Sequence, residues 1–220
     1  MFENISIIID KLVLDKIPSL YAKCILINGI FVKPDTYPLL ENRKKEIIEQ
    51  WSGKTEDDLD TDPYITAYRA LHSGINPEGA RMLPAVEAML KRGIMKKKFP
   101  RINSIVDTAN ITSLENMIPV GVFDYDRTEG ELKLSLSGKG DAFIPIGSDK
   151  QIKLPEYTPV LMDRKGIFSA VGHRDSVRTM ISSASRNVIA FSWGTDKIES
   201  GNVEKTLLEF HNRITAGYNI

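Results

Sequence analysis

Cysteine is almost absent from this sequence, and its scarcity excludes two kinds of architecture. Cys24 is the only cysteine among 220 residues, so the chain can form neither an internal disulfide nor a cysteine-rich metal site. The histidines stand singly at positions 72, 173 and 211, without the spacing of zinc ligands. We therefore expect no bound metal and no cofactor. Cys24 lies in an apolar run, which predicts a small buried side chain rather than a nucleophile.

Long apolar runs are also absent. No stretch approaches the length of a membrane-spanning helix, and the first ten residues contain neither a basic leader nor a small-residue cleavage site. The sequence lacks a phosphate-binding glycine loop and a G-x-S-x-G nucleophile elbow. With 42% hydrophobic and 26% charged residues, the composition is that of an ordinary globular protein. We expect a cytoplasmic protein that makes no membrane contact.

Net charge is missing too, because 29 basic residues balance 29 acidic ones. No overall field therefore draws the chain to nucleic acid. The charges are unevenly spread, however. Residues 55–62 contain five acids and no base, and residues 91–101 contain six bases and no acid. The basic run is either a solvated helix end, which is the commoner explanation, or a set of phosphate contacts.

The spacing of apolar residues predicts a mixed α+β chain. Helices are predicted over 37–51, 62–73, 84–93, 102–117 and 202–215, and strands over 5–14, 22–32, 132–136, 142–146, 159–162, 167–172 and 188–193. Asn202 is the expected N-cap of the last helix, and residues 163–166 give a hairpin signal. We expect one domain over 1–220. It would comprise a strand pair and helical region (1–100), a core motif region (101–200) and a C-terminal helix (201–220).

The most informative segment runs from Arg101 to Arg127. Its helix has an apolar face and, beside it, a polar stripe at i, i+4 and i+7 that consists of Asn103, Asp107 and Asn110. Asn and Asp are poor helix formers, so three on one stripe indicate a task other than helix formation. After the helix, Pro119 and Gly121 lead into an aromatic and acidic turn, Phe123-Asp124-Tyr125-Asp126.

A second polar segment follows a predicted strand, where binding groups are often displayed. It concentrates an imidazole, two guanidinium groups, a carboxylate and two hydroxyls in seven residues: His173, Arg174, Asp175, Ser176, Arg178 and Thr179. Arginine forks suit phosphate or carboxylate. The structural alternative is a hydrogen-bonded loop in which Asp175 pairs with an arginine and orders a turn.

These segments resemble the B3/B4 tRNA-editing domain of the bacterial phenylalanyl-tRNA synthetase beta subunit. The family pattern N-x-x-V-D-x-x-N, then Pro, then F-D, matches residues 103–110, Pro119 and Phe123-Asp124. Arg174-Asp175-Ser176 matches a triplet of the free-standing relatives. Their N-terminal helical region resembles Tyr68-Arg69, Asn76-Pro77, Arg81 and residues 84–88. The resemblance covers roughly residues 60–195. In one respect the chain departs from the pattern, because Gly121 stands where the synthetase domain usually has a histidine.

The resemblance implies a three-layer α+β fold with a β-sandwich of the editing-domain type and peripheral helices. It also implies a pocket for the aminoacylated 3′ end of tRNA, with no binding of DNA, and hydrolysis of mischarged tRNA in trans. His173 is the expected general base, because histidine has the intrinsic pKa best suited to that role, and Asp175 would orient it or the water. Arg174 or a backbone N–H would stabilise the oxyanion. The expected ligand-binding residues are Asn103, Asp107, Asn110, Gly121, Phe123, Asp124, Ser176, Arg178 and Thr179. The first three would either bind ribose hydroxyls or hold the helix against the pocket wall. His72 and His211, on predicted helices, are expected to be structural.

Two other functions stay open at this point. One is a non-catalytic tRNA- or RNA-binding accessory module, and the other is a pocket for free amino acids. A complete phenylalanine–tRNA ligase is not expected, because its ATP-binding core does not fit beside this module in 220 residues.

Overall fold

The strands of the protein form two four-stranded sheets and one two-stranded sheet. The computed structural model describes residues 2–75 and 83–218. The first sheet has the order β1 (Phe2–Asn4), β3 (Tyr21–Ile27), β10 (Val188–Gly194) and β4 (Gly121–Asp124), and all its neighbours are antiparallel. The second has the order β2 (Ile7–Ile9), β5 (Leu132–Leu136), β8 (Pro159–Asp163) and β9 (Gly166–Ala170). The third pairs β6 (Ala142–Phe143) with β7 (Ile152–Lys153).

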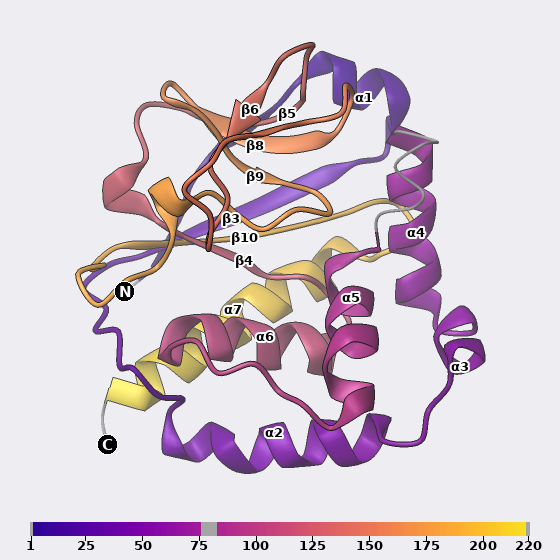
Figure 1. Ribbon diagram of the computed structural model, residues 1–220, viewed down its shortest axis with the longest axis vertical. Coiled ribbons are helices and arrows are strands. Elements are labelled where there is room, and N and C mark those ends of the chain that lie inside the picture. Colours follow the sequence, from indigo (N-terminus) through magenta and orange to yellow (C-terminus); the bar gives the residue numbers. More distant parts are fainter. Residues whose placement is uncertain (1, 76–82, 219–220) are drawn as a thin grey trace.

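The second sheet lies on one side of the first sheet and most helices lie on the other, except that α1 (Lys11–Lys16) packs against β5 of the second sheet (Figure 1). The helix bounds are α1 Lys11–Lys16, α2 Pro38–Trp51, α3 Glu56–Asp60, α4 Pro63–Ile75, α5 Ala85–Arg92, α6 Ser104–Asn116 and α7 Ser200–Tyr218. Helices α6 and α7 pack side by side below the first sheet, and α2 packs on α6 (Figure 1). Short 3-10 helices are η2 (Ile94–Lys96), η3 (Tyr125–Arg127) and η4 (Val177–Thr179). The predicted α+β class is confirmed.

The core lies around β10, where every residue is buried because sheet neighbours, the second sheet and α7 surround it. Apolar residues at helical spacing on α7 face it, as the sequence predicts: Val203, Leu207, Phe210 and Ile214 are all buried. In β5 the three leucines Leu132, Leu134 and Leu136 are buried as expected, but the alternation is incomplete, because Ser135 is buried too and donates a hydrogen bond to the Asp10 carboxylate at 3.0 Å. The predicted turn at 163–166 closes the hairpin between β8 and β9, where Asp163 pairs with Gly166.

Several predicted element boundaries are wrong. The strand expected over 5–14 ends at Ile9, because the Asp10 side chain accepts a hydrogen bond from the Leu12 backbone N–H at 3.1 Å and so caps α1. Helix α7 begins at Ser200, before the expected cap. Asn202 lies inside the helix and donates a hydrogen bond to the Tyr64 hydroxyl at 2.9 Å.

Other predictions differ in detail. The strand expected over 22–32 ends at Ile27, and the acidic run contains a helix that was not predicted, α3, with a capping box between Thr55 and Asp58. Cys24 is buried, as expected, and burial raises the pKa of its thiol to about 12. Asn76, Pro77 and Arg81, which carried part of the resemblance, lie outside the described residues. Among the described helices, none is long and apolar enough to cross a membrane.

Candidate functional site

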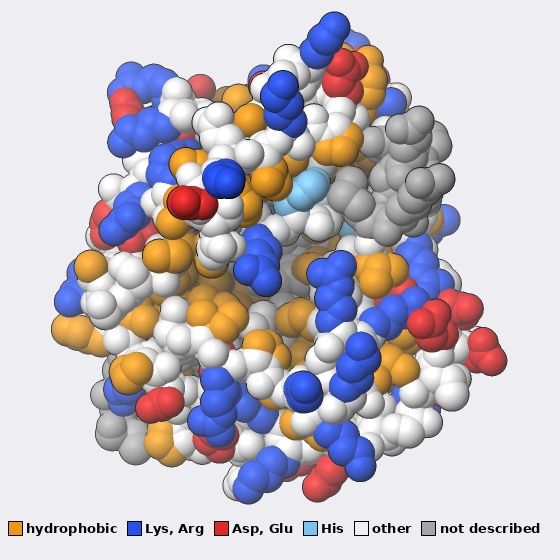
Figure 2. All heavy atoms as spheres, viewed as in Figure 1, with side chains coloured by type: hydrophobic (Ala, Val, Ile, Leu, Met, Phe, Trp, Pro, Cys, Tyr) orange, Lys and Arg blue, Asp and Glu red, His pale blue; other side chains and the backbone are white. Residues whose placement is uncertain are grey.

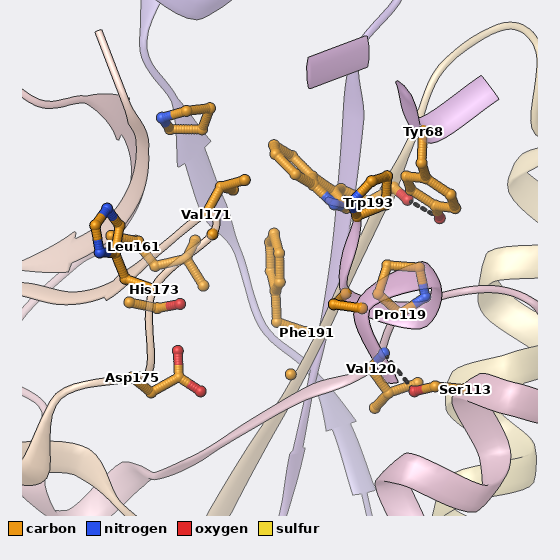
Figure 3. Close-up of a pocket in the computed structure, with 18 of the residues that line it drawn as sticks. Tyr68, Ser113, Pro119, Val120, Leu161, Val171, His173, Asp175, Phe191 and Trp193 are labelled. Atoms are coloured by element: carbon orange, nitrogen blue, oxygen red, sulfur yellow. Dashed lines mark hydrogen bonds between the residues drawn. The ribbon is translucent and has the colours of Figure 1, made fainter. Parts of the chain in front are cut away.

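A cavity of about 520 Å³ lies between the helices and the second sheet, within the usual size range of ligand sites. Figure 3 shows its two walls. Leu161, Val171, His173 and Asp175 stand on one side, and Tyr68, Ser113, Pro119 and Val120 on the other. Phe191 and Trp193 of β10 lie between the walls. The cavity thus brings together the two segments that the sequence singled out, 103–126 and 170–179.

Asp175 is the carboxyl group of this cavity. Its side chain accepts a hydrogen bond from Ser169, and burial raises its pKa to about 6. Among the ion pairs of the described residues none involves Asp175, although Arg174 precedes it and Arg178 follows three residues later. The alternative in which Asp175 pairs with an arginine to order a turn is therefore wrong.

His173 lies two residues before Asp175 on the same wall (Figure 3). Burial lowers the pKa of its imidazole below the usual value, so the ring is neutral at pH 7. Its Nε2 atom is buried and has no hydrogen-bond partner among the described residues. Within the described part of the chain, no hydrogen bond joins the His173 ring to the Asp175 carboxyl. Asp175 therefore does not orient the imidazole by a direct hydrogen bond. A neutral imidazole with a vacant nitrogen can accept a proton from a bound water.

Arg174 also lines the cavity, and it is exposed. One guanidinium nitrogen lies 3.4 Å from the Ile146 carbonyl oxygen, which is a weak contact. Its charge therefore remains available to a ligand.

The rest of the segment has structural roles. Arg178 forms two hydrogen bonds of 2.9 Å with Asp163, so its fork is already occupied and is not free for phosphate. The Ser176 hydroxyl accepts a hydrogen bond from the Arg178 backbone N–H at 3.2 Å, and Thr179 is fully buried. None of the three is among the residues that line the cavity.

The polar stripe of α6 also contains residues with structural partners and one residue that lines the cavity. Asn103 is the N-cap and accepts hydrogen bonds from the backbone N–H groups of Ile105 and Val106 at 3.1 and 3.0 Å. Asp107 forms a buried ion pair with Lys44 at 2.8 Å. Only Asn110 lines the cavity. Two of the three expected ligand-binding residues thus stabilise the helix and its packing.

Three expected binding residues lie in the turn after α6. Gly121 is accessible from the cavity, whereas Phe123 and Asp124 are buried. Gly121 begins β4 and lines the cavity, and a Cβ atom added there would lie 3.2 Å from the Phe123 ring. Phe123 also lines the cavity, but it is 2% exposed and packs edge-on against Phe168 at 5.0 Å, so its face is not free to stack on a base. Asp124 is buried outside the cavity, where it accepts a hydrogen bond from the Ser185 hydroxyl at 2.5 Å.

Sequence reasoning missed several cavity residues. Tyr68 and His72 lie one turn apart on α4, and the Tyr68 hydroxyl donates a hydrogen bond to the Trp193 carbonyl at 2.7 Å. The His72 ring packs against the Trp193 ring at 6.1 Å, so His72 is buried as expected but also borders the site. Two signals were available: Tyr68 lies in the segment that resembles the family's helical region, and Phe191 and Trp193 alternate in a predicted strand.

The basic run contains both paired and unpaired cations. Lys91 pairs with Glu56 and Glu87, and Arg101 pairs with Glu41. The exposed cations that form no ion pair with a described residue are Arg92, which lines the cavity, and Lys96, Lys97 and Lys98. Figure 2 shows Lys and Arg side chains beside the hollow and below it, over α5 and α2. Across residues 2–75 and 83–218, no three His, Cys, Asp or Glu side chains are grouped so that they could hold a metal ion.

Known proteins resemble part of this chain. A family model described as the B3/4 domain matches residues 73–207. The phenylalanine–tRNA ligase beta subunit of Neisseria meningitidis serogroup B is 26% identical over 113 residues, which are 51% of this chain and 14% of that protein. The Mycoplasma genitalium beta subunit is 31% identical over 87 residues, or 40% of this chain and 11% of that protein.

Solved structures resemble it at the level of the fold. An N-terminal fragment of the phenylalanyl-tRNA synthetase beta subunit from Pyrococcus horikoshii superposes with a TM-score of 0.50 and 14% sequence identity. The match covers 97% of this chain and 49% of that fragment. The chain therefore corresponds to a limited part of each of these relatives.

Proposed function

This chain belongs to the B3/4 domain family, and from that membership we propose that it is a tRNA-binding domain whose cavity receives the aminoacylated 3′ end of tRNA. The observation that carries the proposal is a single cavity joining Asn110 and Gly121 to His173 and Asp175. The family match spans both segments. The matched relatives are named as tRNA ligase subunits, which supports tRNA as the ligand.

The chemistry of the cavity suits such an end. Its interior is lined by apolar and aromatic side chains such as Phe191 and Trp193, which fit an amino-acid side chain. Arg92 and Arg174 line it as cations without an ion-pair partner among the described residues, and they suit a phosphodiester. Lys96–Lys98 would then follow the RNA backbone away from the cavity. This supports the phosphate-binding interpretation of the basic run for its unpaired members.

The proposed reaction is hydrolysis of the ester that joins a wrong amino acid to the terminal ribose, in trans to the ligase that made the error. A bound water attacks the ester carbonyl carbon while the neutral His173 imidazole takes its proton, and the carbon–oxygen bond to the ribose then breaks. The ribose oxygen leaves with the proton that His173 returns. Arg174 or a backbone N–H would stabilise the oxyanion. Positioning of ester and water would supply much of the acceleration.

The second candidate is an accessory module that binds charged tRNA without hydrolysis. The specific observation that favours it is Gly121, which stands where the family usually has a histidine and leaves that part of the cavity without a titratable group. A pocket for free amino acids is the third candidate, and it would not need the exposed lysines.

The test is a deacylation panel of correctly and incorrectly charged tRNAs, with binding of charged tRNA, uncharged tRNA and free amino acids measured at two salt concentrations. We expect hydrolysis of at least one mischarged tRNA and its loss in His173→Ala, with binding retained. Salt-sensitive binding without hydrolysis of any substrate would select the accessory module. Binding of free amino acids with no affinity for tRNA would overturn the RNA proposal.

Three broader expectations belong to the same proposal. We infer that residues 1–220 act as one domain, since the largest hydrophobic core draws side chains from Val13 to Ile214. The two four-stranded sheets would correspond to the β-sandwich of the editing domains. The proposed substrate is used in translation, which supports the cytoplasmic location expected from sequence.

A further inference from the structure

Asp175 is a carboxyl group that has no countercharge among the described residues. Arg178, the cation three residues away, is held by Asp163 at 2.9 Å, and no ion pair within 4.0 Å joins Asp175 to any described Lys or Arg. The Ser169 hydroxyl supplies its one side-chain hydrogen bond. A desolvated carboxylate is costly unless a positive group meets it. The cavity is where such a group can arrive.

The other charged and titratable side chains that line the cavity come from three elements. They are Tyr68 and His72 of α4, Arg92 of α5, and His173 and Arg174 of the loop that contains Asp175. Burial keeps His173 neutral, and the Tyr68 hydroxyl is bound to the Trp193 carbonyl with a pKa well above its usual value. The two arginines line the cavity without pairing with Asp175. Residues 2–75 and 83–218 therefore leave this carboxylate without an ion pair.

We propose that Asp175 binds the α-ammonium group of the aminoacyl ester and makes the cavity selective for a free amino group. This inference rests on the proposed function and names the chemical class of its substrate. An aminoacyl ester carries its ammonium on the carbon next to the ester carbonyl. With the ammonium at Asp175, the carbonyl lies beside the wall that also contains His173 (Figure 3). Hydroxyacyl and N-blocked aminoacyl ends would leave the carboxylate unpaired and bind weakly.

The proposed pairing of the Asp175 carboxylate with the α-ammonium group of the ligand makes binding depend on pH. Burial raises the pKa of Asp175 to about 6, so the carboxylate is present only as the pH rises past that value. An α-amino group loses its proton near pH 8. The preference for an ammonium ligand should therefore peak between about pH 6 and 8 and vanish below about pH 5.

The experiment compares two ligands that differ only in that charge. One is 3′-amino-3′-deoxyadenosine acylated with L-phenylalanine through an amide, which resists hydrolysis, and the other carries (S)-3-phenyllactic acid, with a hydroxyl in place of the ammonium. An alanine and lactic acid pair repeats the comparison with a small side chain. Calorimetric binding at pH 7 is measured for wild type, Asp175→Asn and Asp149→Asn. Asp149 is an exposed carboxylate with no ion pair to a described residue, so it is a matched control.

We expect wild type and Asp149→Asn to prefer the ammonium ligand by at least about tenfold and Asp175→Asn to bind both ligands alike. Equal binding by wild type, or a preference that survives in Asp175→Asn, would overturn this inference and leave the proposed function standing. If wild type binds neither adenosine ligand, the proposed function fails and the inference falls with it. The wild-type pH profile is a second measurement that needs no variant. A preference unchanged from pH 7 to pH 5 also overturns the role of Asp175.

Discussion

Asp107 and Asp175 lie in the two motifs that the sequence singled out, yet the fold treats them in opposite ways. Asp107 is 1% exposed and pairs with Lys44 at 2.8 Å, and it also accepts hydrogen bonds from the Thr36 hydroxyl and the Ile102 backbone N–H. Asp175 lines the cavity with one hydrogen bond, from Ser169. A buried carboxylate with a full set of partners holds elements together. A carboxylate that no cation of the described residues meets is where we propose that the ammonium group of the ligand binds.

The arginines of the second motif repeat the contrast. Arg178 ties η4 to the end of β8 through Asp163, whose side chain is fully buried. Arg174, four residues earlier, has one weak contact and lines the cavity. Residue type alone therefore does not separate structural from functional charges. Their partners do.

The largest effect on stability is expected when the buried ion pair between Asp107 and Lys44 is removed. Asp107→Ala leaves the Lys44 ammonium buried without its partner, which should lower the free energy of unfolding by about 3–5 kcal/mol. Urea unfolding measures it. Glu49→Ala on the exposed side of α2 is the control and should change stability by less than about 0.5 kcal/mol. A loss below about 1 kcal/mol for Asp107→Ala would show that this network is not a structural anchor.

The next effect separates Arg178 from Arg174. Arg178→Ala should cost about 2–3 kcal/mol, since it leaves the buried Asp163 without its cation, and it should leave the salt dependence of tRNA binding unchanged. Arg174→Ala should be nearly neutral in unfolding but weaken binding of a charged tRNA end. Denaturation and a binding series over salt concentration, run on both variants, check this pair. A stability loss in Arg174→Ala together with weaker tRNA binding in Arg178→Ala would contradict these roles.

A smaller effect concerns the unpaired carboxylate and pH. In the folded state the pKa of Asp175 is about 6, above its usual value of 3.8, so the group contributes stability at low pH that is lost as the pH rises through 6. Asp175→Asn removes this loss. Its stability relative to wild type should rise by about 1–2 kcal/mol between pH 4 and pH 7. Urea unfolding across that range, with Asp149→Asn as control, measures the difference. A constant difference would show that Asp175 is not desolvated.

The smallest effect on the fold is expected at the exposed lysines. Replacing Lys96, Lys97 and Lys98 by Ala should change the free energy of unfolding by less than about 0.5 kcal/mol. It should still reduce the slope of log affinity for tRNA against log salt by about 2, because three phosphate contacts are lost. The matched control replaces Lys139, Lys150 and Lys153, which are also exposed, and should leave the slope unchanged. Equal slopes in both triple variants would exclude the basic run as the RNA path.

The sequence by itself determined the class of the fold, most helices and the two segments that form the cavity. These depend on local patterns: apolar spacing on α7, alternation in β5, the turn at 163–166 and the motif around α6. The same patterns failed where a single side chain changed the outcome. Asp10 is the N-cap of α1, so the second half of an apolar run that was predicted as a strand forms a helix.

Only the tertiary structure decided which polar residues belong to the site. Asp107 forms an ion pair with Lys44 on α2, and Arg178 forms one with Asp163 on β8. No local sequence pattern reveals these pairs, because the partners lie on other elements. The same packing brings Trp193 of β10 and Tyr68 of α4 into the cavity. It also leaves Asp175 without a cation from any part of the chain that the structure describes. Burial and distant partners set the free energy of a charge, and both exist only once the chain has folded.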